Sequence, residues 1–143
     1  MKMSPEYFIS IAWSLPLGNY VVESSTENLA FVSRVIAAGR RKGILCLTIN
    51  LSSYNDVGQA FSSVEGDSIN RVIEGKSKQS IIHFESADVL AANDKYTFWL
   101  RTALEIERYT TGNVIPIFSL TQNAIEAMFL DVKAPFYQSH FSF

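Results

Sequence analysis

The sequence predicts a three-layer α/β domain with a mainly parallel sheet of about five strands. Short apolar segments alternate with amphipathic helical segments along most of the chain, which is typical of strands joined by helical crossovers. One segment, residues 44–49, is a continuous apolar run, as expected of a strand covered on both faces. With 143 residues, 48% hydrophobic and 18% charged, the chain has enough apolar side chains for one core. We therefore expect one domain over residues 1–143, as a whole protein or as a domain of a longer one.

The first half of the chain is predicted to form a strand, a helix and a second strand. Residues 20–22 favour a β-strand. In the helix that follows, Ser24 and Glu27 occupy capping-box positions, and Gly39 is expected at the C-terminal cap. The apolar positions of this helix recur at helical spacing and are Leu29, Val32, Val35 and Ile36. Residues 44–49 form the second strand.

The middle of the chain predicts helices on either side of a third strand. Two short helical stretches, residues 55–64 and 68–74, lead to a strand at residues 80–84. The clearest helix covers residues 93–110, because an apolar stripe runs beside a polar one and Gly112 suits its C-terminal end.

The end of the chain predicts two more strands. Residues 114–118 favour a fourth strand, in which Pro116 removes one N–H donor and so indicates an edge, an end or a bulge. Thr121 is expected to cap a short helix that ends at Met128. Residues 136–143 are rich in aromatic side chains and predict a last strand or hairpin arm, which can run antiparallel to the others.

Charge and cysteine content limit the classes of function. The 12 basic and 14 acidic residues leave a formal net charge of -2, so nucleic acid and anionic lipid are not favoured partners. No apolar run approaches the roughly 20 residues that span a bilayer, and residues 1–7 do not resemble a signal peptide. The single cysteine, Cys46, is interpreted as a core residue, and no Cys/His spacing suggests zinc. We expect a cytoplasmic protein without metal or cofactor.

The turn at residues 23–29 follows the first strand, where open α/β sheets bind their ligands. A phosphate-binding loop at this place needs glycines that let the backbone wrap the phosphates and a lysine that reaches them. The turn has neither, and Glu23 and Glu27 place negative charge where a polyphosphate would lie. Ser24 and Glu27 are therefore interpreted as a helix cap, and we expect neither catalysis nor ATP hydrolysis.

Several segments together resemble the RecA and KaiC-like ATPases. Residues 15–22, 31–39 and 43–47 resemble the opening of that family, and residues 80–86 resemble its Walker B strand. Residues 113–119 are similar to the strand that follows a long helix there. The resemblance covers about residues 15–127 and implies a RecA-like fold.

The departure from the family lies at the phosphate-binding loop. Gly18 and Glu85 match family positions, whereas the lysine and hydroxyl of Walker A have no counterpart. Without a held triphosphate, an acidic residue at position 85 cannot bring about hydrolysis. The chain thus resembles non-catalytic members such as the cell-division inhibitor SulA and the N-terminal part of the cellulose-synthesis regulator BcsE.

This resemblance implies a bacterial regulatory or scaffolding domain that acts by binding protein, with a second copy of itself among the partners. The alternative is a sensory domain that binds a small molecule or nucleotide second messenger in the former nucleotide cleft. The basic cluster Arg40, Arg41 and Lys42, expected just after the first helix, is the candidate contact for an anion or partner. Its structural interpretation is a set of cations that stabilise the helix dipole.

Aromatic side chains near the C-terminus are the candidate protein-binding edge, although such residues are more often core. They are Phe136, Tyr137, Phe141 and Phe143. Of the remaining polar residues, His83 lies in an apolar strand and is expected to be hydrogen-bonded in or near the core. Glu105 and Glu107 are two residues apart on a helix, so they do not share a face, and we expect a solvated exterior for both.

Overall fold

A computed structural model of the chain describes residues 3–14, 19–75, 78–92, 95–131, 133–134, 136 and 140–142. The helices are α1 (Pro5–Ser14), α2 (Thr26–Arg41), α3 (Val57–Ser62), α4 (Val64–Glu74), α5 (Lys95–Thr110) and α6 (Gln122–Ile125). The strands are β1 (Asn19–Glu23), β2 (Leu45–Asn50), β3 (Ser80–Glu85), β4 (Val114–Leu120) and β5 (His140–Ser142). Short 3-10 turns at Leu51–Ser53 and Ala87–Ala92 and a π-helical turn at Glu126–Leu130 complete the described elements.

The sheet is built on four parallel strands in the order β2-β3-β4-β1. The three residues of β5 pair in parallel with β1, with His140 opposite Asn19, so this last segment does not run antiparallel. The α/β class and the parallel sheet predicted from the sequence are confirmed.

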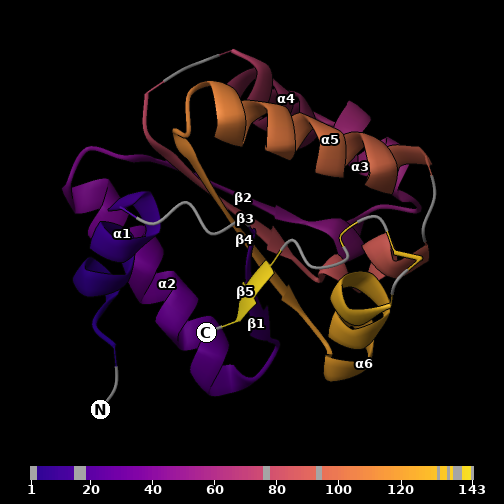
Figure 1. Cartoon of the computed structure of the whole chain (residues 1–143), viewed down its shortest axis with the longest axis horizontal. Helices are drawn as coiled ribbons and strands as arrows, with labels where there is room; N and C mark the ends of the chain where they lie inside the picture. Colours follow the sequence, from indigo (N-terminus) through magenta and orange to yellow (C-terminus); the bar gives the residue numbers. More distant parts are fainter. Residues whose placement is uncertain are drawn as a thin grey trace.

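Helices cover both faces of the sheet (Figure 1). Helices α1 and α2 lie on one face, and α3, α4, α5 and α6 lie on the other. Because side chains alternate along a strand, Tyr20 and Val22 pack in the α1–α2 layer, whereas Val21 packs in the other layer. The sheet therefore separates two hydrophobic cores.

Two predicted strand positions differ from the structure. Pro116 lies in β4, which is an interior strand between β3 and β1, and not at an edge. The ladder with β1 begins only at the next residue, Ile117, so the missing N–H lies where β1 starts. The apolar run that forms β2 is at the sheet edge, and its Thr48 is exposed, so this strand is not covered along its whole length.

The ends of α2 also differ from the prediction. Ser25, and not Ser24, is the N-cap, and its Oγ accepts a hydrogen bond from the Asn28 N–H at 3.1 Å. Gly39 lies inside the helix, and a Cβ there would come within 3.0 Å of Cys46 Sγ and Ile81 Cδ1. The glycine thus lets α2 pack closely on the sheet, and the chain reverses one turn later at Gly43, whose φ is +78.

Helix α1 was not predicted, although Pro5 is typical of a first helical position. It is placed by Phe8, Ile9 and Ala12, which are buried against α2. None of the helices within the described ranges is long and apolar enough to cross a membrane.

Candidate functional site

The crevice expected to hold a ligand lies between the carboxyl ends of β1 and β4. Helix α2 leaves β1 toward one face of the sheet, and α6 leaves β4 toward the other. In open α/β sheets such a switch point is the ordinary ligand site. The turn at residues 23–29 borders this crevice.

Hydrogen bonds hold the turn at residues 23–29 against the end of β4 and within itself. The Ser24 N–H donates to the Leu120 carbonyl at 2.8 Å, which joins the turn to the end of β4. The Ser25 N–H donates to the Glu23 carbonyl at 2.8 Å, and Asn28 Nδ2 donates to the same carbonyl at 2.9 Å. With the Asn28 N–H bonded to Ser25, these donors of the turn are used internally and do not point at a ligand.

The side chains at this edge are mainly acidic or neutral. Glu23 and Glu27 are exposed on the turn, and Glu85 ends β3. Asp88 Oδ2 accepts hydrogen bonds from the Thr121 N–H at 3.0 Å and the Thr121 hydroxyl at 2.6 Å, which ties the next loop to the start of α6. In the described part of the chain, no three Asp, Glu, His or Cys side chains come together to hold a metal ion. Glu23, Glu27 and Glu85 therefore place negative charge at this edge of the sheet, which opposes a polyphosphate.

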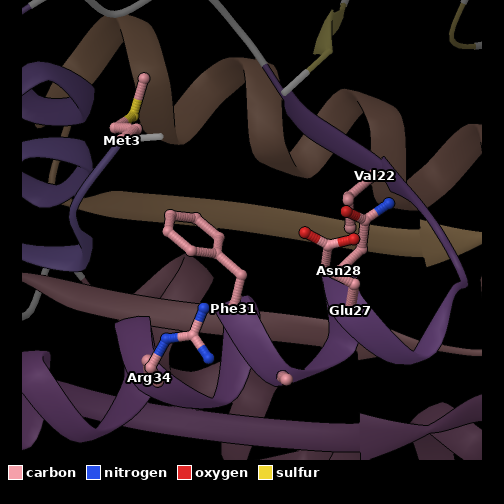
Figure 2. A pocket seen from close by; sticks show the side chains of 7 residues that line it. Met3, Val22, Glu27, Asn28, Phe31 and Arg34 are labelled. Atoms are coloured by element: carbon pink, nitrogen blue, oxygen red, sulfur yellow. The ribbon is translucent and has the colours of Figure 1, made fainter. Parts of the chain in front are cut away.

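A pocket of about 580 Å³ opens beside the first half of α2. Figure 2 shows the Phe31 ring standing between Met3 on one side and Val22, Glu27 and Asn28 on the other. The wall of the pocket is mostly apolar. It consists of Met3, Val22, Glu27, Asn28, Ala30, Phe31 and Arg34. Among the described residues that line it, only Glu27 and Arg34 are charged, so this wall suits a small apolar molecule better than a polyanion.

The basic cluster lies at the opposite end of α2 from this turn and pocket. Arg40 and Arg41 belong to the last turn of the helix, and only Lys42 follows it, which corrects their predicted position. A 16-residue helix is about 24 Å long, so the cluster is distant from the crevice. Arg40 donates to the Cys46 carbonyl at 3.4 Å, and Arg41 pairs with Glu6 at 3.4 Å. These contacts favour the structural interpretation, while an anionic partner at this end remains a prediction.

Phe136 does not belong to an exposed edge. Its side chain is 0% exposed and lies 5.5 Å from the Phe118 ring and 5.7 Å from the Phe129 ring, centroid to centroid. The prediction was wrong here because the sequence does not show that the chain turns inward before β5. Tyr137 and Phe143 lie outside the described residues. The backbone of Phe141 pairs with Tyr20, but its side chain is likewise outside the described part.

Glu107 is also not on a solvated exterior, since its side chain is only 4% exposed. Its carboxylate accepts hydrogen bonds from the Asn113 N–H at 2.8 Å and the Val114 N–H at 3.2 Å, and from the Thr111 hydroxyl. It therefore fastens the end of α5 to the start of β4. Glu105 is half-buried and pairs with Arg101 at 3.1 Å.

His83 and Cys46 are core residues, as predicted. His83 Nε2 lies 2.8 Å from Ser119 Oγ, and burial lowers the pKa of the imidazole to about 4. The Cys46 thiol is buried against the carbonyls of Ile36 and Ile44, and burial raises its pKa, which keeps it a weak nucleophile.

The buried imidazole makes a testable contribution to acid sensitivity. Native His83 stays neutral down to about pH 4, whereas an unfolded histidine binds its proton near pH 6.5. The unfolded state therefore binds more protons between these values, and unfolding free energy should fall by about 3 kcal/mol as pH drops through this window. Urea unfolding at pH 7, 6, 5 and 4 measures it. The His83→Gln variant should lose this dependence of the unfolding free energy on pH. An unchanged dependence would show that His83 does not cause it.

A surface that the sequence analysis missed runs along α5. Three adjoining hollows of about 490, 360 and 400 Å³ follow this helix where it meets α3 and α4. Ile106 lines one of these hollows and is 59% exposed, and two further large side chains of α5, Phe98 and Tyr109, are 48% and 83% exposed. We call the hollows and these side chains the α5 surface. Phe98, Ile106 and Tyr109 recur at helical spacing on the solvent side of α5. This pattern of large apolar residues in the sequence could have revealed the α5 surface.

No protein-family model matches the chain, and no curated protein sequence is significantly similar to it. The candidate site therefore rests on the hydrogen-bonded turn at residues 23–29, the pocket beside α2 and the α5 surface.

Proposed function

We propose that this chain is a non-catalytic RecA-like domain that regulates or scaffolds a cytoplasmic assembly by binding protein. The observation that carries the proposal is the closed turn at residues 23–29. Its Ser24, Ser25 and Asn28 N–H groups bond to Leu120, Glu23 and Ser25 of the same chain, and Glu23 and Glu27 add repulsion toward phosphate. These bonds and charges support a role for this edge of the sheet in holding the fold together and not in binding nucleotide.

The strand order supports the RecA-like part of this proposal. In the two commonest doubly wound orders the first strand lies beside the second. Here β4 lies beside β1, and both β3 and β4 separate β1 from β2. A RecA-like relationship implies this order, in which the strand after the Walker B strand lies beside the first strand.

The α5 surface supports the protein-binding part. Its exposed side chains are large and mostly apolar, and such patches on a folded protein are typical of interaction sites. A groove along a helix is a common way to receive another helix.

Calorimetric titration with ATP and magnesium tests the loss of the nucleotide site. We expect no binding tighter than about 1 mM, because the Ser24, Ser25 and Asn28 N–H groups are already bonded within the chain and residues 23–29 contain no cation for the phosphates. The Glu23→Gln, Glu27→Gln double variant serves as control and should also fail to bind, because removal of charge does not free the N–H groups. Micromolar binding, or turnover that Glu85→Gln abolishes, would contradict the proposal.

The second candidate is a sensory domain, and the pocket beside α2 favours it. Arg34 and Glu27 bring opposite charges to a mostly apolar wall, which suits a small apolar molecule with one polar group better than a nucleotide second messenger. The same calorimetric titrations with such molecules separate this candidate from the first.

A further inference from the structure

Strand β2 forms one edge of the sheet, and within the described part of the chain no strand pairs with its outer side. The Leu45 N–H donates to the Gln79 carbonyl at 3.3 Å, on the side of β3. Main-chain groups alternate in direction along a strand, so those of every second residue from Leu45 face β3. The N–H and carbonyl groups of Cys46, Thr48 and Asn50 therefore face outward, where an added strand would pair.

This edge lacks the features that usually protect an exposed strand from pairing. The strand has six residues, none of them proline or charged, and its register with β3 runs from Leu45 to Asn50 without a bulge. The described strand at the other edge, β5, has only three residues. Thr48 is exposed, so the outer side of β2 is accessible. Of the two edges, β2 is therefore the better template for a further strand.

The basic cluster lies beside the start of this edge. Arg40, Arg41 and Lys42 are exposed and come just before β2. Arg41 pairs with Glu6 at 3.4 Å, whereas Arg40 and Lys42 have no acidic partner among the described residues. The Arg40 guanidinium reaches the outer side of β2, because it donates to the Cys46 carbonyl at 3.4 Å. That contact uses one of its several N–H donors, so the others can bind a carboxylate.

We infer that the outer edge of β2 binds an extended, acidic segment of a partner protein as a further strand of the sheet. The outward main-chain groups select an extended backbone. Carboxylates of the segment pair with Arg40 and Lys42 at the start of β2. The inference rests on the proposed protein-binding function and specifies the chemistry of the partner.

A second copy of the chain fits this edge less well than an acidic segment does. Its own β2 would bring no carboxylate, because residues 45–55 contain no acidic residue. Pairing of two β2 strands would therefore satisfy main-chain groups but would not match the charge of Arg40 and Lys42. The charge of the cluster is thus what favours a foreign, acidic strand.

Fluorescence anisotropy with a labelled peptide is the first test. The probe alternates valine and threonine, which favour extended backbone, and begins and ends with glutamates. We expect a dissociation constant on the order of 100 µM or below, at least about tenfold lower than for the same peptide ending in lysines. The formal net charge of -2 by itself favours the lysine peptide, so this preference requires a local basic site. Equal binding of the two peptides, or no binding at about 1 mM, would overturn the inference.

Charge reversal locates the acidic side chains of the bound segment. The Arg40→Glu, Lys42→Glu double variant should bind the glutamate peptide at least about tenfold more weakly. Arg34→Glu, Lys133→Glu is the matched control, since it changes the net charge equally on the β1 side of the sheet. Arg34 lines the pocket with Val22 of β1, and Lys133 lies in sequence between α6 and β5, which both contact β1. Equal losses for the two double variants would overturn the assignment.

The alternating direction of main-chain groups gives a test that leaves the protein unchanged. In an added strand, only the N–H groups of alternate peptide residues face β2. Backbone N-methylation of one alternating set in the glutamate peptide should therefore abolish binding, whereas N-methylation of the other set should leave it nearly unchanged. Equal effects of the two sets would rule out strand addition.

Thr48→Pro removes an outward N–H and leaves the ladder between β2 and β3 intact. Proline is tolerated on an edge strand when its nitrogen faces solvent, so the variant should stay folded, which circular dichroism verifies. It should bind the glutamate peptide at least about tenfold more weakly. Wild-type affinity in the folded variant would place the peptide elsewhere on the molecule and overturn the inference.

Sedimentation velocity separates a second copy from a foreign segment, and we expect a monomer at about 100 µM. A dimer that Thr48→Pro dissociates would assign the edge of β2 to a second copy and overturn the inference. Failure of the peptide to bind overturns strand addition and leaves the non-catalytic function standing. Tight binding of ATP with magnesium overturns that function, whether or not the peptide binds.

Discussion

Glu107→Ala should lower the free energy of unfolding by about 3 kcal/mol, the larger part of it from N–H groups left without partners. The Asn113 and Val114 N–H groups would lose their acceptor at 2.8 and 3.2 Å, and the Thr111 hydroxyl would lose its own. The side chain is 4% exposed, so water cannot easily replace it. Glu107 joins α5 to β4, so the substitution should lower the stability of the whole fold. We expect a lower urea midpoint, with an unchanged dependence of the unfolding free energy on urea concentration.

Glu105→Ala is the matched control for this prediction. It removes a carboxylate two residues away that forms only a half-exposed pair with Arg101. Such i,i+4 pairs contribute about 0.3 to 0.5 kcal/mol, so the urea midpoint should hardly change. Equal losses for the two variants would show that Glu107 is not the fastening between α5 and β4.

Phe136→Ala should cost about 3 to 5 kcal/mol, the range for truncating a fully buried aromatic side chain. The ring packs between Phe118 and Phe129, and Phe118 in turn stacks on Phe84 at 4.8 Å between centroids. Removal would leave a cavity beside the stacked pair, which the surrounding strands can fill only in part.

Thermal and urea unfolding measure this loss, with Tyr7→Ala as control. Tyr7 is an aromatic residue of similar size that is 59% exposed, so its truncation should change stability by no more than about 0.5 kcal/mol. A Phe136→Ala variant of wild-type stability would restore Phe136 to the protein-binding edge predicted from the sequence.

The order of strands and helices was largely predictable because its signals are local. Period, turn residues and caps identify the segments of β1, α2, β2, β3, α5 and β4, and the Thr121 cap is found as expected, bonded to the Ala124 N–H at 3.3 Å. Helix α1 escaped prediction because its identity depends on a face buried against α2.

The candidate site was predictable only in part. From the sequence alone, residues 23–29 contain neither the glycines nor the lysine that a phosphate-binding loop needs. That the turn is closed on β4 was not predictable, since Leu120 is remote in sequence from Ser24 and only the sheet order brings them together. The role of Glu107 was not predictable either. In the sequence it is an ordinary charged residue of a helix, and only the fold brings its carboxylate to the N–H groups at the start of β4.

The sequence by itself determined an α/β chain of amphipathic helices and apolar strands, without the residues of a phosphate site. Those properties follow from composition and from spacing over a few residues. Only the tertiary structure decided that β4 lies inside the sheet, that Phe136 and Glu107 are buried, and that Phe98, Ile106 and Tyr109 stand exposed on α5. The physical reason is that burial and hydrogen-bond partnership depend on contacts between distant segments, which local patterns do not specify.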